Sequence, residues 1–124
     1  MRRRPLRIRD IVVVQFPKHM PRGREQEEER PAIIVGIPSQ LGEPRFSMLI
    51  VVPLTTSREQ NWAAACPRLY PKLAAGTGGL PRESVVLIDQ VRSVDRLRLL
   101  RFIGSLTLED YEPILAGLCQ MLCP

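Results

Sequence analysis

The side chains that most often do nucleophilic, acid–base or metal chemistry are scarce in this sequence of 124 residues. Its one histidine, His19, lies in a polar stretch between a lysine and a methionine. The cysteines are Cys66, Cys119 and Cys123, an odd number without the spacing of a zinc site or a disulfide framework. Without a Cys–His or His–His pair, the sequence lacks the catalytic side chains that metal hydrolases and two-histidine ribonucleases need.

A structural role is the better interpretation of the thiols. Cys119 and Cys123 lie four residues apart on a predicted helix, which puts them on one face, but no further ligand completes a metal site there. We therefore expect small thiols packed in the core of a protein that works in a reducing cytoplasm.

Two polar positions next to predicted strands remain. A long loop over residues 17–30 contains Pro17, Pro21, Gly23 and many charges, and it ends at Arg30 before Pro31. Loops of this length tend to be functional. A later strand ends in three hydroxyl side chains, at residues 55–57. Composition and spacing alone do not assign an activity to either position.

The net charge of +5 is unevenly distributed. Residues 1–24 hold eight basic side chains and one acid, residues 25–30 hold four acids and one base, and the rest of the chain is nearly neutral. A positive field of this kind attracts phosphates and is screened by salt. The arginines at positions 2–4 are equally compatible with a contact to a polyanion and with a solvated tail.

Short β-branched runs dominate the rest of the sequence. They predict strands over 11–16, 31–37, 47–55 and 84–90, a continuation over 91–94, and weaker strands near 68–73 and 102–103. Pro53 cannot donate to a ladder, so we expect the third strand to be bulged, at an edge, or leaving the sheet there.

One amphipathic helix is predicted at the C-terminal end. Residues 107–110 resemble a capping box, and an apolar stripe follows at Leu108, Tyr111, Leu115, Leu118 and Leu122. Pro113 is tolerated only near the first turn, so the start could move to Asp110.

These elements predict a mainly β fold with a C-terminal helix, arranged as a small closed or half-closed barrel. The length predicts one domain over residues 1–124, with residues 1–6 as a flexible basic tail. No apolar run is long enough for a membrane span, and we expect no secretory signal.

An ordered set of short segments resembles the MazF/PemK-type toxins. The opening half is carried by Asp10-Ile11-Val12-Val13-Val14, Phe16-Pro17, Gly23-Arg24-Glu25-Gln26 and Arg30-Pro31-Ala32-Ile33-Ile34-Val35. The second half is carried by Val51-Val52-Pro53-Leu54-Thr55, Gly79-Leu80, residues 85–95 and Ile103-Gly104-Ser105-Leu106. Each segment alone is weak, but their order and approximate spacing from Arg7 to the last helix are specific.

The resemblance implies an SH3-like small barrel of the CcdB/PemK type that acts as the toxin of a type II toxin–antitoxin system. It further implies a cytoplasmic homodimer and a sequence-specific endoribonuclease that cleaves single-stranded RNA by 2′-OH attack, without a metal or other cofactor. The expected partners are the RNA substrate and a cognate antitoxin whose disordered tail blocks the cleft.

The same resemblance implies the site residues. The catalytic arginine of the family falls on Arg30 and its catalytic threonine on Thr55. A guanidinium can hold two oxygens of the transition-state phosphate, whereas a threonine hydroxyl positions the 2′-OH or relays a proton better than it acts as a base. The expected RNA-binding residues are Phe16, Arg24, Glu25, Gln26, Thr56, Ser57, Asp89 and Gln90.

Some positions depart from the family pattern. Arg9 stands where the family usually has a glycine, Gln15 replaces a frequent acid, and Leu87 stands where one branch has a catalytic arginine. Trp62 and Tyr70, in the poorly matched segment after Ser57, either stack bases or cover the core, the second being favoured. The alternative functions are a catalytically silent SH3-like module that binds RNA or protein, and a CcdB-like gyrase poison.

Overall fold

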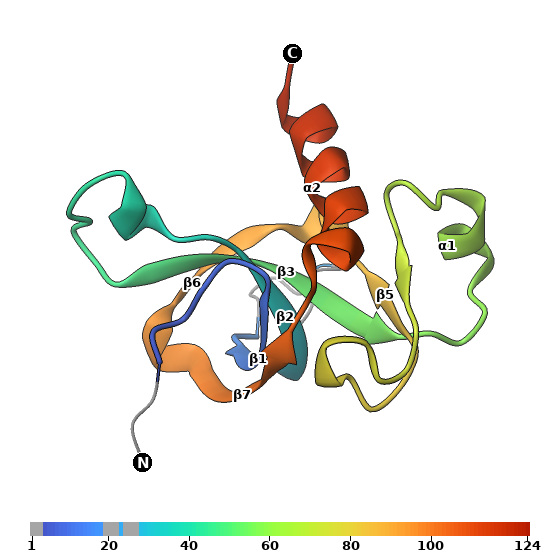
Figure 1. Cartoon of the computed structure of the whole chain (residues 1–124), viewed down its shortest axis with the longest axis horizontal. Helices are drawn as coiled ribbons and strands as arrows, with labels where there is room; N and C mark the ends of the chain where they lie inside the picture. The colour runs from blue at the N-terminus through green and yellow to red at the C-terminus, as the bar shows by residue number, and fades with distance from the viewer. Residues whose placement is uncertain (1–3, 19–22, 24–27) are drawn as a thin grey trace.

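The described part of the chain forms seven strands and two α-helices (Figure 1). The computed structural model describes residues 4–18, 23 and 28–124. The strands are β1 (Asp10–Phe16), β2 (Glu28–Gly36), β3 (Met48–Thr56), β4 (Lys72–Leu73), β5 (Ser84–Val86), β6 (Arg92–Asp95) and β7 (Leu99–Ser105). The helices are α1 (Asn61–Ala65) and α2 (Leu108–Leu122), with 3-10 turns η1 (Pro38–Gln40), η2 (Thr77–Gly79), η3 (Ile88–Gln90) and η4 (Arg96–Arg98).

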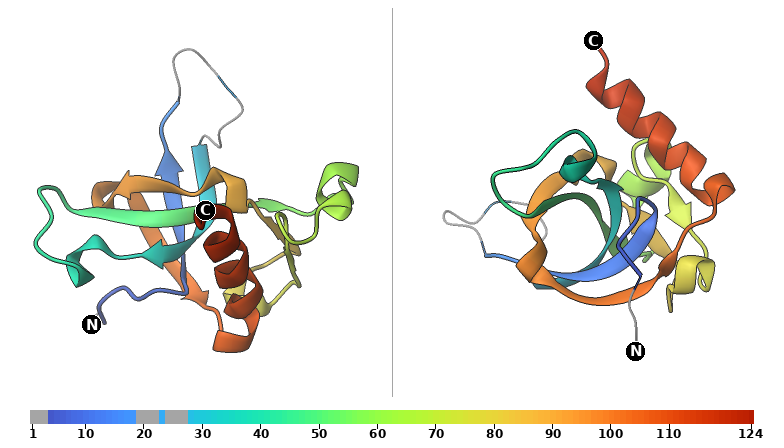
Figure 2. Two further views of the ribbon diagram at one scale, coloured as in Figure 1. Left: turned by 90° about the horizontal axis from the view of Figure 1, so that it is seen from above. Right: turned by 60° about the vertical axis from the view of Figure 1, so that its left-hand side comes forward.

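All strand pairs are antiparallel, in the order β4-β5-β3-β2-β1-β7, and β6 pairs with β3 as well. The strands curve around a common axis, and α2 lies outside them (Figure 2). In the part of the chain that the structure describes, no pairing joins the β4 edge to the β7 edge, so the barrel is half-closed. The predicted mainly β fold with a C-terminal helix is confirmed.

The central strands are buried on both faces, which explains their continuous apolar sequences. On β2, Ala32 and Ile34 face one cluster that includes Val14 and Val51, while Ile33 faces a second cluster. That second cluster includes the inner side of α2, where Tyr111, Ile114 and Leu118 are buried. The two clusters together hold the sheet and the helix in one core.

Pro53 lies where β3 changes partners. β3 pairs with β6 up to Val51 and with β5 from Leu54 onward, and the carbonyl of Pro53 accepts a hydrogen bond from the N–H of Leu87 at 3.0 Å. The carbonyl of Pro53 is therefore paired with the segment after β5, although its nitrogen has no hydrogen to donate. The strand is neither broken nor at an edge at this point, but it passes from one neighbour to another.

Several predicted boundaries move. Residues 28–30 belong to β2 rather than to the loop, and the strand expected over 84–90 ends at Val86 and is followed by η3. The helix α1 was not predicted. The early start of β2 arises because Phe16 pairs with Glu28, so β1 extends the strand through long-range pairing that local sequence does not encode.

Helix α2 begins at Leu108 because Thr107 caps it: the Thr107 hydroxyl accepts a hydrogen bond from the N–H of Asp110 at 3.1 Å. The suggested shift of the start to Asp110 is wrong, and Pro113 lies inside the helix. The predicted stripe is only partly buried, since Ile114 replaces Leu115 in the core.

Cys119 and Cys123 were expected in the core, and this expectation is wrong. Cys66, Cys119 and Cys123 are all exposed. For Cys119, the reason is the rotation of α2: the helix turns its Tyr111, Ile114 and Leu118 face to the sheet and leaves the positions on its other side to solvent. Cys123 follows the last residue of the helix in an extended conformation.

The described part of the expected basic tail contacts the barrel. Arg4 forms an ion pair with the buried carboxylate of Asp10 at 2.9 Å, and its guanidinium stacks over the ring of Phe102 at 5.0 Å. Asp10 also accepts hydrogen bonds from the Ser105 hydroxyl at 2.6 Å and from the Arg7 N–H at 2.8 Å. Arg4 thus joins the start of β1 to the end of β7.

Asp10 makes the stability dependent on pH. Burial alone would raise the pKa of Asp10, but hydrogen bonds from Arg4, Ser105 and the Arg7 backbone outweigh it and lower the pKa below 3.8. A lowered folded-state pKa stabilises the fold above the unfolded-state value, and this stabilisation is lost as the pH falls through the folded-state value. We expect Asp10→Asn to remove this pH dependence, measured by urea unfolding between about pH 2 and pH 7. Glu43→Gln, in an exposed loop, is the control and should keep the wild-type profile.

Arg9 has a backbone conformation that favours glycine, with φ of 83°. Its side chain donates a hydrogen bond to the Leu106 carbonyl at 3.0 Å. Both Arg9→Gly and Arg9→Ala lose that bond, but only glycine relieves the backbone. We expect the glycine variant to exceed the alanine variant by about 1 kcal/mol in free energy of unfolding. Equal stabilities of the two variants in denaturant titrations would contradict backbone strain at position 9.

Candidate functional site

Arg30 and Thr55 line the same pocket. We call it the Arg30 pocket; its volume is about 210 Å³, and it is lined by Glu29, Arg30, Pro31, Leu54, Thr55, Thr56, Leu80, Pro81, Arg82 and Ser84. The side chains of both residues are partly exposed. A phosphate can therefore reach the guanidinium and the hydroxyl from solvent.

The register of the sheet explains why these two residues meet. Ala32 on β2 pairs with Pro53 on β3, and Arg30 and Thr55 each lie two residues outward from that pair. In an antiparallel pair, residues two apart share a face, so the register directs both side chains to the same side of the sheet. Two residues that are 25 positions apart in the sequence thus line one pocket.

Positive charge dominates the wall of the Arg30 pocket. Arg30 and Arg82 contribute guanidinium groups, and Glu29 is the one acid among the described residues of the lining. The Glu29 carboxylate lies 3.9 Å from Arg101, with both side chains more than half exposed, so this ion pair contributes little to stability. The lining can hold an anion between two arginines and present threonine hydroxyls to it. Arg82 was not singled out in the sequence, because its segment carries no recognisable pattern.

The other hydroxyl residues differ from one another. Thr56 lines the Arg30 pocket, as expected for a substrate contact. Ser57 does not line it, and its hydroxyl oxygen is buried without a hydrogen-bond partner among the described residues. The N–H of Ser57 donates to the Glu83 carbonyl at 2.9 Å, which holds the end of β3 against the segment before β5.

Phe16 does not contact this surface. Its ring is completely buried in the cluster with Val14 and Val51, and the guanidinium of Arg92 covers it at 5.3 Å. Because β1 turns its side chain inward, the Phe16 ring presents no surface to the Arg30 pocket, and its contact with RNA stays a prediction. The charged group at this place is Arg92, which the sequence did not reveal.

Asp89 and Gln90 lie in η3, outside the lining of the Arg30 pocket. Asp89 is exposed and accepts a hydrogen bond from the Tyr70 hydroxyl at 2.6 Å. Arg24, Glu25 and Gln26, the remaining predicted RNA contacts, and His19 lie outside the described residues.

An aromatic pair borders the face of the sheet that carries Thr55. Thr55 pairs with Val85, which is buried together with Ala63 and Leu87, and Tyr70 packs on these three. Trp62 meets the Tyr70 ring edge-on at 4.9 Å and is 48% exposed. Trp62 therefore covers the core less than expected, whereas Tyr70 does cover it.

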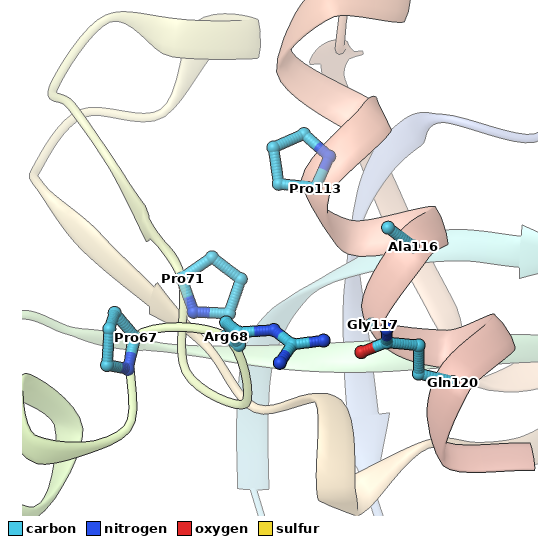
Figure 3. Close-up of a pocket in the computed structure, with 7 residues that line it drawn as sticks. All are labelled: Pro67, Arg68, Pro71, Pro113, Ala116, Gly117 and Gln120. Atoms are coloured by element: carbon cyan, nitrogen blue, oxygen red, sulfur yellow. The ribbon is translucent and has the colours of Figure 1, made fainter.

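A second pocket, lined by Pro67, Arg68, Pro71, Pro113, Ala116, Gly117 and Gln120, lies between α2 and the segment before β4 (Figure 3). Gly117 allows the close approach, since a Cβ there would come within 2.7 Å of the Ile88 side chain and 3.1 Å of the Arg68 carbonyl. The wall is largely apolar and shares no residue with the Arg30 pocket.

Among the described residues there is no group of three or more His, Cys, Asp or Glu side chains placed to hold a metal ion. The helices of that same part of the chain include none that is both long and apolar enough to cross a membrane.

Comparison with known proteins identifies the family. The model of the family described as "PemK-like, MazF-like toxin of type II toxin-antitoxin system" matches residues 7–122. The chain therefore belongs to the PemK-like and MazF-like toxins. A search of curated protein sequences gave no match.

Solved structures share the fold. MazF (form I) from Deinococcus radiodurans is 21% identical, with 95% of this chain and 96% of that chain covered and a TM-score of 0.68. The Mycobacterium tuberculosis toxin MazF-mt6 is 19% identical, with 90% and 94% covered and a TM-score of 0.63. A mycobacterial endoribonuclease in complex with its cognate antitoxin is 18% identical, with 96% and 95% covered and a TM-score of 0.63.

The Tyr70–Asp89 hydrogen bond can be tested by titration. Donation to Asp89 is the main cause that raises the pKa of Tyr70 to about 12, with burial and the charge of Asp89 adding to it. We expect Asp89→Asn to lower this pKa toward 10, followed by tyrosinate absorbance in a Tyr111→Phe background, which leaves Tyr70 as the one tyrosine. Circular dichroism checks that the fold persists. An unchanged midpoint would show that the bond is absent in solution.

Proposed function

We propose that this chain is an endoribonuclease that cleaves single-stranded RNA without a metal ion, with Arg30 and Thr55 as its catalytic residues. The observation that carries the proposal is that a guanidinium and a hydroxyl from facing strands line one solvent-accessible pocket. Membership of the PemK-like and MazF-like toxin family supports a toxic activity for the protein that carries this pocket. Proteins of the same fold include one named as an endoribonuclease.

Arg30 stabilises the charge that develops during cleavage. In the reaction, the ribose 2′-oxygen forms a bond to phosphorus, the bond from phosphorus to the 5′-oxygen of the next nucleotide breaks, and a 2′,3′-cyclic phosphate remains. The 2′-hydroxyl loses its proton and the leaving 5′-oxygen gains one. The pentacoordinate transition state carries extra negative charge on its non-bridging oxygens, and a planar guanidinium binds two of them at once.

Thr55 positions the attacking 2′-hydroxyl. Its own hydroxyl is a poor base at neutral pH, so it acts by hydrogen bonding to the reacting groups rather than by removing the proton alone. That Arg30 and Thr55 line the same pocket supports a binding mode in which the arginine holds the phosphodiester and the threonine lies beside its ribose.

We expect further side chains to bind the RNA on either side of the cleaved bond. Thr56 and Arg82 line the same pocket and contact the sugar–phosphate backbone. Asp89, whose carboxylate is oriented by Tyr70, accepts hydrogen bonds from base amino groups, and Gln90 follows it in η3. Arg24, Glu25, Gln26 and Ser57 complete the proposed RNA contacts of the family pattern.

The proposed partners follow from the family. A MazE–MazF complex from Deinococcus radiodurans and a mycobacterial complex with its cognate antitoxin share this fold. We infer that this chain likewise binds an antitoxin, whose tail occludes the Arg30 pocket, and that it acts as a cytoplasmic homodimer.

The test is incubation of the purified protein with a long single-stranded RNA in excess EDTA. We expect discrete fragments that end in cyclic phosphate, and at least about a 100-fold lower rate with Arg30→Ala. Arg68→Ala is the matched control, because Arg68 lines the separate pocket beside α2. This variant should cleave RNA at the wild-type rate. Intact RNA with wild-type protein at every concentration would contradict the proposal and favour the non-catalytic module.

Thr55 gives a second test of the same site. Thr55→Ser keeps the hydroxyl and should retain most of the cleavage rate, whereas Thr55→Val keeps the shape and should lose it. The rate at saturating RNA is the quantity to compare. Similar rates for the two variants would remove Thr55 from the catalytic groups.

A further inference from the structure

A larger hollow than the Arg30 pocket lies beside β6. We call it the Phe46 pocket; its volume is about 420 Å³, and it is lined by Pro17, Phe46, Met48, Arg92, Ser93, Val94, Asp95 and Arg98. This volume falls in the range of sites that hold small organic ligands. Among the residues that the structure describes, the pocket shares none with the Arg30 pocket, and no proposed catalytic or RNA-binding residue lines it.

The pocket presents an aromatic face to solvent. The Phe46 side chain is 61% exposed, an unfavourable position for a ring that could pack in a core. The guanidinium of Arg45 lies 5.1 Å from the ring centroid, so a cation stacks with the same ring. An exposed ring beside arginines is the arrangement on which single-stranded nucleic acids stack their bases.

The charge around the Phe46 pocket is positive. Between positions 92 and 101 the chain carries four arginines and one acid, Asp95. The Asp95 carboxylate accepts a hydrogen bond from the N–H of Leu97 at 2.9 Å, so this acid caps η4. Two arginines, Arg92 and Arg98, belong to the pocket lining itself. The surroundings therefore favour an anionic ligand with a flat apolar part.

The Phe46 pocket is connected to the Arg30 pocket through β1 and β3. Arg92 pairs with Val51, four residues before Thr55 on β3, which is about 13 Å along the strand. The guanidinium of Arg92 also covers Phe16, and β1 pairs Val14 with Arg30. Met48, which lines the pocket together with Phe46, lies seven residues before Thr55 on β3, about 23 Å along the strand, so a strand of several nucleotides is needed to span both pockets.

We propose that the Phe46 pocket is a nucleotide subsite that binds an unpaired base of the RNA away from the cleaved bond. The base stacks on Phe46, and Arg98 contacts its phosphate. This inference rests on the proposed function, since it assigns a second contact to the same substrate strand. Its effect is on affinity and on the length of RNA that is recognised, not on the chemical step.

The test uses a fluorescent single-stranded oligonucleotide whose riboses are all 2′-O-methylated, so that it cannot be cleaved by 2′-OH attack. Binding is followed by fluorescence anisotropy. We expect Phe46→Ala to weaken binding between about 5-fold and 150-fold, as the loss of one base stack does, and Phe46→Trp to retain it. Leu41→Ala is the matched control, because Leu41 is an exposed apolar residue in the same loop and lies outside the pocket.

Arg98 allows an independent test of the proposed subsite. Arg98→Ala should weaken binding and reduce the slope of log affinity against log salt by about 0.7, the value for one phosphate contact on a single strand. Arg68→Ala removes an arginine elsewhere and should leave the slope unchanged. With cleavable RNA, both Phe46→Ala and Arg98→Ala should raise KM and leave kcat unchanged.

The outcomes separate the subsite from the proposed function. Cleavage by the wild type with equal affinities for Phe46→Ala and Leu41→Ala would overturn the subsite and leave the nuclease intact. Binding that depends on Phe46, without cleavage of RNA by the wild type, would support the subsite and reject the nuclease. Absence of binding to the oligonucleotide would overturn the subsite. So would Phe46-dependent binding of a polyglutamate peptide in place of RNA, which would assign the pocket to a protein partner.

Discussion

The antiparallel register between β2 and β3 is the constraint on which the site depends. Pairing of Ala32 with Pro53 directs Arg30 and Thr55 to one side of the sheet at the open end of the strands. A slip of one residue would turn one of the two side chains to the opposite face, and the pocket would lose either its guanidinium or its hydroxyl. The apolar clusters on both faces oppose such a slip, because it would also expose Ile33 or Ile34.

The change of partners at Pro53 gives the site its second wall. Since β3 leaves β6 at Val51 and joins β5 at Leu54, its last residues lie beside Ser84 and the loop that precedes it. The loop supplies Leu80, Pro81 and Arg82 to the pocket. A proline in the middle of the longest apolar run is therefore compatible with the sheet and directs β3 to a different neighbour at the place where function is proposed.

The basic surface of the protein is more extended than the charge sums indicate. The chain after residue 30 is nearly neutral in total, yet its arginines are concentrated between positions 92 and 101. Several acids that balance them lie elsewhere, for example Glu109, Asp110 and Glu112 at the start of α2, where negative charge complements the helix dipole. The net charge of the chain does not distinguish the arginine-rich surface from the acidic start of α2. The force that each charge exerts on a ligand depends on their distance in the folded protein.

The sequence by itself determined the main strands and the capped helix and, through the family resemblance, predicted Arg30 and Thr55 as the catalytic residues. These features depend on local properties: β-branched runs, the Thr107 cap, and short motifs in order. Tertiary structure alone decided that Phe16 is buried, that Cys119 is exposed, and that two residues 25 positions apart line one pocket. Burial and proximity depend on which face of an element meets its neighbour, and that is determined by pairing and packing between distant segments rather than by the residues beside it.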